Sequence, residues 1–471
     1  MVEWLIVALE LFFVSYFSIA LLFYVAFGLV ALVDLTRCRR RVWRTDLRAL
    51  RSGVGYQPIS ILVPARNERE TIVASVRSLL MLDYPEFEVI VVNDGSTDDS
   101  LARLQEAYGL VPVPMAWPVH LRTRPIAQAY RSAEHRNLIV LDKVQGGKSD
   151  ALNAGINVSQ YPLFCSLDAD SLLESDALLR IARALAEDER IVAAGGIIRV
   201  LNGATVKDGK VDAAHAPRSL LLLAQSQEYV RGFLSGRTAL GRWDWLLILS
   251  GAFALFRKSA VIDAGGYRSD TVTEDLEIIV RLRRRAREQR TAHRIIFVPD
   301  PVCWTQIPSD LKSLLRQRDR WQRGLWETLW IHRRVLFDPR YGRLGLGAMP
   351  FHLFFEAFGP TIECFGYVVT LALVLTGRLD VGFALGFVAV ALASGLGLSI
   401  LALLLDDLLF RRYASAGDLA KMMAGALLEF VGYRQLLTVQ RTLALFGLLD
   451  RRRRWGRIRR TAIGHEARRT A

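Results

Sequence analysis

The sequence of 471 residues has few cysteines and lacks the two common glycine-rich nucleotide loops. Its four cysteines, at positions 38, 165, 303 and 364, have neither metal-ligand spacing nor the pattern of a disulfide framework, and they suit a reducing cytosol. Gly147-Lys148-Ser149 looks like the end of a phosphate loop, but Asp142 stands where its first glycine is required. No Gly-x-Gly-x-x-Gly follows a predicted strand, so neither an NTPase nor a dehydrogenase is indicated.

Negative charge is scarce relative to positive charge. The chain has 61 lysines and arginines against 47 acidic residues, a formal net charge of +14. The arginines concentrate beside apolar segments and in residues 451–471, where they would meet anionic lipid headgroups. No nucleic-acid-binding motif accompanies this charge. We therefore expect membrane lipids, and no nucleic acid, as partners.

Residues 4–33 are an almost unbroken apolar run with a single charge, Glu10. At about 1.5 Å per residue, a helix of this length exceeds a bilayer core of roughly 30 Å. The run lacks the basic start and small-residue cleavage site of a removable signal peptide. A basic cluster at residues 37–41 follows it, and such clusters tend to stay in the cytoplasm. Residues 1–36 are thus predicted to be an anchor that places the next domain inside the cell.

The C-terminal third, residues 345–450, is predicted to hold interfacial and transmembrane helices, followed by a basic cytoplasmic tail at 451–471. Residues 381–405 carry no charge and 360–376 form a second candidate span, with an interfacial helix at 346–359 leading into it. Residues 419–449 are interrupted by charges and have basic flanks on both sides. A re-entrant or surface-lying amphipathic helix is favoured there, and a third full span is the alternative.

Residues 57–330 alternate short β-rich runs with helical patterns. Strands are expected at 59–64, 89–93, 138–142 and 163–167, with helices at 70–82 and 149–158. This alternation predicts an α/β domain with a doubly wound parallel sheet. Ligands bind at the carboxyl ends of the strands in such sheets. Glu68, Asp94, Asp168 and Asp170 all follow strand ends, so they are expected at the same edge.

Asp168 and Asp170 lie one residue apart at the end of an apolar run. Residues i and i+2 of a strand point the same way, so both carboxylates would enter one pocket. Adjacent carboxylates repel unless a cation lies between them, and Mg²⁺ and Mn²⁺ favour oxygen ligands. The pair predicts a divalent-metal site that bridges to a phosphate-bearing substrate. A solvated turn is the alternative.

Four acidic or aromatic motifs occur in a fixed order: VVNDGS with Asp94, LDAD with Asp168 and Asp170, TED with Glu274 and Asp275, and QRDRW with Gln317, Arg320 and Trp321. Together with VPARNE and GGKSDALNAG, this set resembles the membrane-bound family 2 glycosyltransferases, which are similar to cellulose, hyaluronan, chitin and poly-N-acetylglucosamine synthases. The resemblance covers about residues 57–330 and implies a GT-A-like domain flanked by transmembrane and interfacial helices.

The resemblance implies a donor site at the strand ends. Asp94 and Glu68 would contact the uridine of a UDP-sugar, since carboxylates accept hydrogen bonds from uracil N–H and ribose hydroxyl groups. Asp168 and Asp170 would hold Mg²⁺ or Mn²⁺ on the diphosphate, and Lys148 would reach nucleotide or phosphate oxygens. The alternatives are turn formation for Asp94 and a solvated side chain for Lys148.

The resemblance also implies a transfer site. Asp275 would be the general base that removes the proton of the acceptor hydroxyl, and Glu274 would orient this pair or cap the helix that follows. Gln317, Arg320 and Trp321, close together on a helix, would lie near the leaving group and the acceptor; Ser250 and Gly251 would contact the acceptor sugar. The alternatives are acidic residues favoured by a helix dipole and an amphipathic interfacial helix.

The expected function is an inverting, metal-dependent transferase in the inner membrane. It would use UDP-glucose or UDP-N-acetylglucosamine to build and translocate a β-linked polysaccharide, with accessory export subunits as further partners. A single transfer to a membrane lipid carrier is the alternative, and a non-catalytic transporter or receptor is a more distant one. Residues 112–136 have no clear period and no functional explanation at this stage.

Overall fold

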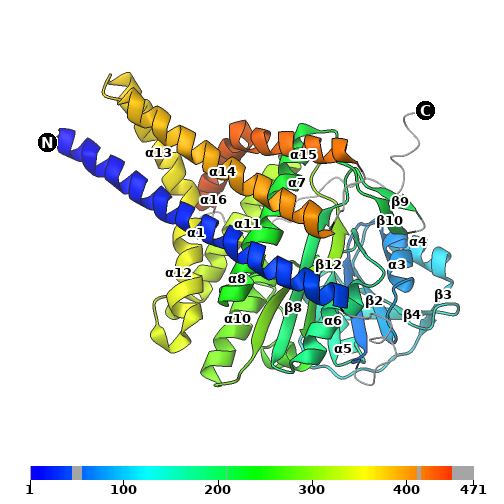
Figure 1. The fold of residues 1–471 in the computed structure, drawn as a ribbon. Helices are drawn as coiled ribbons and strands as arrows, with labels where there is room; N and C mark the ends of the chain where they lie inside the picture. The colour runs from blue at the N-terminus through cyan, green and yellow to red at the C-terminus, as the bar shows by residue number, and fades with distance from the viewer. Residues whose placement is uncertain (1, 45–55, 208, 411–414, 448–471) are drawn as a thin grey trace.

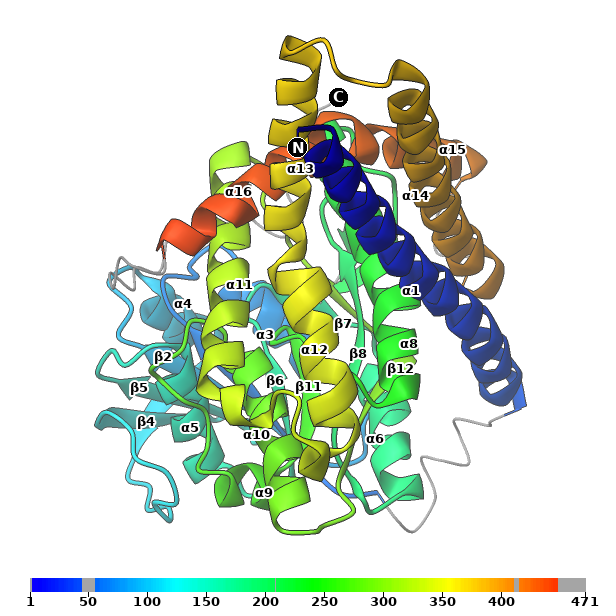
Figure 2. The ribbon, with the colours of Figure 1, turned by 90° about the vertical axis from the view of Figure 1, so that its left-hand side faces the viewer.

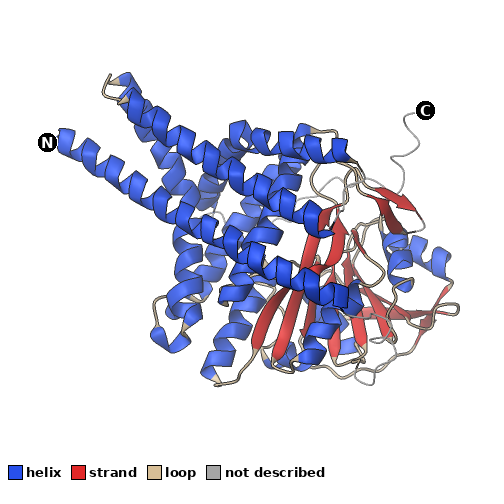
Figure 3. Cartoon of the chain, in the orientation of Figure 1, coloured by secondary structure: helices blue, strands red, loops and turns tan. Residues whose placement is uncertain are grey.

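The computed structural model describes residues 2–44, 56–207, 209–410 and 415–447. Figure 1 shows an α/β domain from which three long helices project to one side, and Figure 3 shows its sheet covered by helices. The predicted basic tail at 451–471 lies outside the described residues, as do Arg411 and Arg412.

The four predicted strands form the centre of a ten-stranded sheet. They are parallel neighbours in the order β5-β2-β1-β6: β1 (Ile59–Ala65), β2 (Phe87–Asp94), β5 (Leu138–Lys143) and β6 (Leu163–Leu167). Side chains of β2 alternate between two cores, with Val89 and Val91 on one face and Ile90 and Val92 on the other. Both faces are buried, which explains why these strands read as continuous apolar runs.

The complete sheet is mixed rather than parallel. Its order is β3-β4-β5-β2-β1-β6-β11-β8-β12-β7, and β11 lies antiparallel between β6 and β8. The predicted α/β fold is confirmed, but its antiparallel strands were not predicted. The remaining strands are β3 (Leu110–Val113), β4 (Ile126–Ser132), β7 (Ser171–Leu173), β8 (Ile191–Val200), β11 (Phe253–Arg257) and β12 (Arg294–Thr305), with β9 (Thr205–Lys207) and β10 (Lys210–Ala213) as a separate pair.

Helices cover both faces of the sheet. One core packs α3, α4 and α6 on the sheet, and the other packs α5, α9 and α10. The helices of this domain are α3 (Ile72–Leu80), α4 (Ser100–Tyr108), α5 (Lys148–Val158), α6 (Ala177–Glu187), α7 (Leu220–Val230), the π-helix η1 (Arg231–Arg237), α8 (Thr238–Trp243), α9 (Lys258–Asp263), α10 (Glu274–Glu288) and α11 (Leu311–Ile331).

The segment 112–136, unexplained by the sequence, runs from β3 to β4 across α5. Asn157 Oδ1 accepts a hydrogen bond from the Leu121 amide at 2.9 Å, and Asp150 Oδ2 accepts one from the Arg124 amide at 3.0 Å. Leu121 is buried in the α5 core. The segment therefore covers one side of the helix that begins at Lys148.

Three helical stretches of the described chain are long and apolar enough to cross a membrane: residues 3–38, 344–375 and 384–408. They comprise α1 (Val2–Arg44), α13 (Gly359–Leu375) with the short turns before it, and α14 (Val381–Phe410), seen in front in Figure 2. The predicted interfacial helix 346–359 continues into α13 after a bend at Phe358. The short helical turns of this stretch are η4 (Leu344–Ala348), α12 (Met349–Phe351) and η5 (His352–Ala357), and η2 (Arg333–Val335) and η3 (Pro339–Tyr341) precede it.

The predicted helical segment 419–449 is broken in two. α15 (Ala416–Leu428) and α16 (Arg434–Gly447) flank the turn η6 (Glu429–Tyr433), in which Val431 and Gly432 leave helical geometry. Gly432 has φ of +90°, a conformation that favours glycine. Neither helix is among the three candidate spans. Arg441 Nε donates to Gln322 Oε1 at 2.8 Å, which fixes α16 against α11.

A buried ion pair joins the α/β domain to the long apolar helices. Arg199 at the end of β8 donates two hydrogen bonds to Asp406 of α14, one of them at 2.9 Å, and both side chains are buried. Ala31 and Leu35 of α1 pack in the same region against Ile197 and Leu405. The orientation of the long helices relative to the sheet is thus set by packing and by charge.

Candidate active site

All twelve predicted site residues line one cavity of about 3000 Å³. The carboxyl ends of the central strands, the first turns of α5 and α10 and the middle of α11 contribute them. They are Glu68, Asp94, Lys148, Asp168, Asp170, Ser250, Gly251, Glu274, Asp275, Gln317, Arg320 and Trp321. The cavity continues past η6 to α1, α13 and α14. The structure therefore brings together residues spread over more than 250 positions.

Asp168 and Asp170 lie in the turn between β6 and β7. The Ser171 amide donates to the Asp168 carbonyl at 3.0 Å, so the aspartates follow the strand rather than belong to it. Asp168 is one-third exposed, whereas Asp170 is buried. Burial and the charge of Asp168 raise the pKa of Asp170 to about 7. The oxygen atoms of these two carboxyl groups form a donor set that suits a divalent cation.

Lys148 bridges two of the acidic motifs. Its Nζ lies 2.6 Å from Asp168 Oδ1 and 3.1 Å from Glu274 Oε1. Burial alone would lower the pKa of Lys148, but the charges of Asp168, Glu274 and Asp275 outweigh burial and raise it. Lys148 is therefore a permanent cation, at the first turn of α5.

Glu274 and Asp275 begin α10, and their pKa values are shifted in opposite directions. Burial and the neighbouring Glu274 charge raise the pKa of Asp275. Burial also opposes ionisation of Glu274, but Lys148 and Arg320 outweigh it and lower the pKa of Glu274. Asp275 Oδ2 accepts a hydrogen bond from the Gly251 amide at 3.1 Å. A side chain at Gly251 would place a Cβ 2.8 Å from Lys148 Nζ, so the ammonium group of Lys148 would have to shift.

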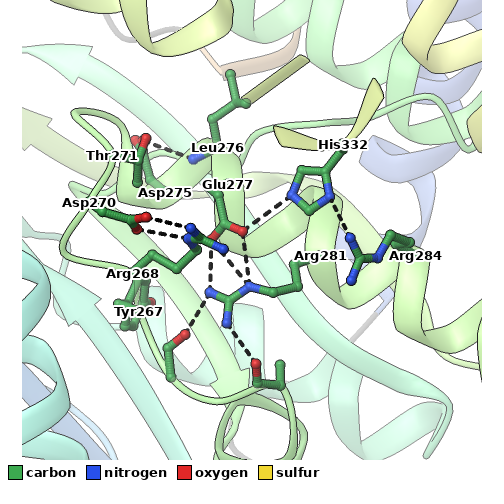
Figure 4. A network of polar contacts seen from close by, with 12 residues as sticks. Tyr267, Arg268, Asp270, Thr271, Asp275, Leu276, Glu277, Arg281, Arg284 and His332 are labelled. Atoms are coloured by element: carbon green, nitrogen blue, oxygen red, sulfur yellow. Dashed lines mark hydrogen bonds and ion pairs between the residues drawn. The ribbon is translucent and has the colours of Figure 1, made fainter. Parts of the chain in front are cut away.

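A polar network behind Asp275 fixes α10 (Figure 4). Glu277 is fully buried and accepts from Arg281 Nη2 at 2.7 Å, and its Oε1 lies 3.2 Å from His332 Nε2. Arg281 also donates to the carbonyl oxygens of Ala264 and Gly266, both at 2.6 Å. The network ties α10 to the loop that precedes the Glu274-Asp275 motif and to the end of α11.

Asp94 is engaged by its own domain. Its Oδ1 accepts from Lys143 Nζ and from the Gly146 amide, both at 2.8 Å, and its Oδ2 accepts from the Gly147 amide at 2.7 Å. These bonds shape the loop that leads to Lys148. Glu68 Oε2 accepts from Thr71 Oγ1 at 3.0 Å. Contact of Asp94 and Glu68 with a uridine stays a prediction.

The helix α11 presents its motif to the cavity. Trp321 is 38% exposed, and Arg318 lies over its ring at 4.3 Å from the centroid. The buried Oε1 of Gln317 has no hydrogen-bond partner among the described residues, so it is open to a donor from a ligand.

Sequence reasoning missed the residues that hold this motif. Arg318 pairs with Glu228 Oε2 at 2.7 Å, and the Tyr433 hydroxyl donates to the same oxygen at 2.8 Å. It also missed Arg237 of η1, which lines the cavity. Partners separated by 90 and 205 positions leave no local pattern, and only the position of Arg318 inside QRDRW was a signal.

The mixed sheet, the acidic side chains at its strand ends and the Glu-Asp pair on α10 define a glycosyltransferase of the GT-A type. The family model "Glycosyltransferase like family 2" matches residues 57–324, more than half of the chain, and the chain belongs to this family. It is therefore a transferase enzyme, and the alternative of a non-catalytic transporter or receptor is not supported.

Curated relatives and a solved structure agree with this assignment. The poly-beta-1,6-N-acetyl-D-glucosamine synthase of Staphylococcus aureus (strain COL) is 29% identical over 272 residues, and that of Staphylococcus epidermidis is 28% identical over 271 residues. Each match covers 58% of this chain, which spans 55% of the relative's length. A mannosyltransferase from Pyrobaculum calidifontis, in complex with GDP-Man and Mn²⁺, has the same fold, with a TM-score of 0.50, 18% identity and coverage of 89% of this chain and 97% of its own.

Proposed function

We propose that the enzyme transfers sugar from a UDP-sugar, UDP-N-acetylglucosamine in the first place, to the growing end of a β-linked glycan. The observation that carries this proposal is the single cavity that holds all twelve motif residues and continues between α1, α13 and α14. The named activity of the staphylococcal relatives favours N-acetylglucosamine over glucose. The catalytic domain would face the cytoplasm, and the product would leave through the membrane part of the cavity.

In this proposal the acceptor hydroxyl displaces UDP directly from the anomeric carbon of the donor sugar, and this displacement inverts the anomeric centre. Asp275 accepts the proton of that hydroxyl as the new bond forms. A raised pKa makes Asp275 a stronger base than an ordinary aspartate. Lys148 and Arg320 supply positive charge for the departing diphosphate. Asp168 and Asp170 would hold a divalent cation, Mg²⁺ or Mn²⁺, whose charge stabilises the leaving group when it is bound.

The test uses the full-length chain in lipid nanodiscs with Mg²⁺ or Mn²⁺ and a panel of UDP-sugars. UDP release is expected with UDP-N-acetylglucosamine, and Asp275→Asn should lower kcat by about 10²- to 10⁴-fold because the base is lost. Asp263→Asn, an exposed aspartate of α9 outside the cavity, is the matched control. Turnover of no UDP-sugar, or an Asp275→Asn enzyme equal to wild type, contradicts the proposal.

A single transfer to a lipid carrier uses the same catalytic residues, so product size separates the two reactions. Gel analysis should give a ladder of glycans for the polymerase and one lipid-linked adduct for the alternative. The continuation of the cavity along α13 and α14 favours the ladder.

A further inference from the structure

Arg237 ends the seven-residue π-helix η1 and lines the cavity. π-Helical turns are rare and occur frequently at functional sites. The guanidinium lies 3.9 Å from the centroid of the Phe233 ring, which fixes the plane of its donors. Arg237 is half-buried, so it is accessible from the cavity while the domain holds its stem.

The guanidinium of Arg237 makes no hydrogen bond or ion pair with any residue that the structure describes. Other arginines of the same cavity do: Arg231 lies 2.5 Å from Glu429, Arg318 lies 2.7 Å from Glu228, and Arg434 lies 3.3 Å from Glu363. A guanidinium carries five N–H donors, and donors removed from water without a partner cost free energy. The donors of Arg237 are thus available to a ligand.

The electrostatic neighbours of Arg237 are Asp275 and Tyr229. Burial lowers the pKa of Arg237 to about 10, and the two neighbours only partly oppose this shift. At the acidic strand ends the contacting cations are instead lysines: Lys148 contacts Asp168, and Lys143 contacts Asp94. Arg237 therefore acts in the part of the cavity where Asp275 is expected to meet the acceptor.

We propose that Arg237 binds the acceptor saccharide, donating hydrogen bonds to oxygen atoms of the sugar whose hydroxyl Asp275 deprotonates. The inference rests on the proposed function. Arg237 can only donate hydrogen bonds and an ionised Asp275 can only accept them. The hydroxyl groups of a sugar ring do both, so the ring can bond to both side chains. Because the proposed function assigns the donor sugar to other residues of the cavity, loss of Arg237 should weaken binding of the acceptor alone.

The test measures initial rates in nanodiscs with UDP-N-acetylglucosamine as donor and a β-1,6-linked N-acetylglucosamine oligosaccharide as acceptor. Arg237→Met should raise the KM for the acceptor about tenfold or more, the loss expected for a charged hydrogen bond, with the KM for the donor unchanged. Arg237→Lys keeps one charge without the planar fork and should give a smaller rise in the acceptor KM. Arg242→Met, an exposed arginine of α8 outside the cavity, is the control.

An unchanged acceptor KM in both Arg237 variants overturns the proposal, as does a rise confined to the donor KM, which would assign Arg237 to the diphosphate. If Arg237→Met does not fold, the Arg237→Lys series decides by the same criterion. Failure of the wild-type enzyme to use any UDP-sugar would count against the proposed function instead, so the two failures are distinguishable.

Discussion

At the scale of single residues, the acidic groups of the cavity differ in how readily they ionise. Asp170 and Asp275 have raised pKa values, whereas Glu274 has a lowered one. When the environment gives neighbouring carboxyl groups different pKa values, the groups can take different acid–base roles. Glu274 is the stable counter-charge for Lys148, and Asp275 is left as the group that can exchange a proton.

Removal of one proposed metal ligand should expose the need for the cation. Asp170→Asn is expected to raise the Mn²⁺ concentration required for half-maximal UDP release by at least about tenfold. Metal affinity falls by about this factor even when a residue that only hydrogen-bonds to a metal ligand is replaced. A metal titration of the initial rate measures this, with Asp263→Asn as control. An unchanged metal requirement would rule out Asp170 as a ligand.

The proposed base predicts the direction of the pH dependence. Asp275 works when ionised, so kcat/KM should fall as the pH falls through its pKa, and this limb should lie above the range of an ordinary aspartate because burial raises that pKa. Saturating metal, if bound by Asp170 as proposed, would keep this carboxyl group ionised during the measurement. Since Lys148 lowers the pKa of Asp275, Lys148→Gln should move the limb to higher pH. A limb that stays in place in Lys148→Gln would contradict the assignment.

At the scale of elements, the position of α10 depends on the buried carboxylate of Glu277, which does not line the cavity. Glu277→Gln leaves the Arg281 guanidinium without its buried counter-charge, and removal of one partner of such a pair costs about 3–5 kcal/mol. Thermal unfolding in nanodiscs should show this loss of stability. Glu288→Gln, which breaks a partly exposed pair with Arg284 on the same helix, is the matched control and should change little. Equal melting temperatures for both variants would contradict the role given to Glu277.

The elements that carry the site could be predicted because their signals are local. Buried apolar runs revealed the four central strands, and strand ends revealed Asp94, Asp168 and Asp170. The break at Gly432 and the π-helix η1 could not be predicted, since both depend on how distant helices pack. The partners of Arg318 and Arg199 were hidden for the same reason: they come from other parts of the chain.

At the scale of the whole molecule, the α/β domain and the long apolar helices meet at the ion pair of Arg199 and Asp406. Asp406→Leu would remove the buried carboxylate that pairs with the Arg199 guanidinium and should destabilise the protein by about 3–5 kcal/mol. The melting temperature in nanodiscs measures this effect. Asp407→Leu, at the next position of α14, serves as control. If Asp407→Leu is the more destabilising variant, the ion pair does not hold the two parts together.

The charged pairs along the cavity also have a consequence for transport. Beyond the acidic motifs its wall carries Arg318 with Glu228, Arg231 with Glu429 and Arg434 with Glu363, so each of these three arginines has an acidic partner beside it. At these pairs a neutral polymer would find weak binding sites of similar strength and no strong electrostatic binding site. A polymer moves along a path only when it can leave each binding site as easily as it enters. Under the proposed function, the cavity lining would then bind the glycan only weakly. Each added sugar could therefore push the glycan forward without a separate source of energy.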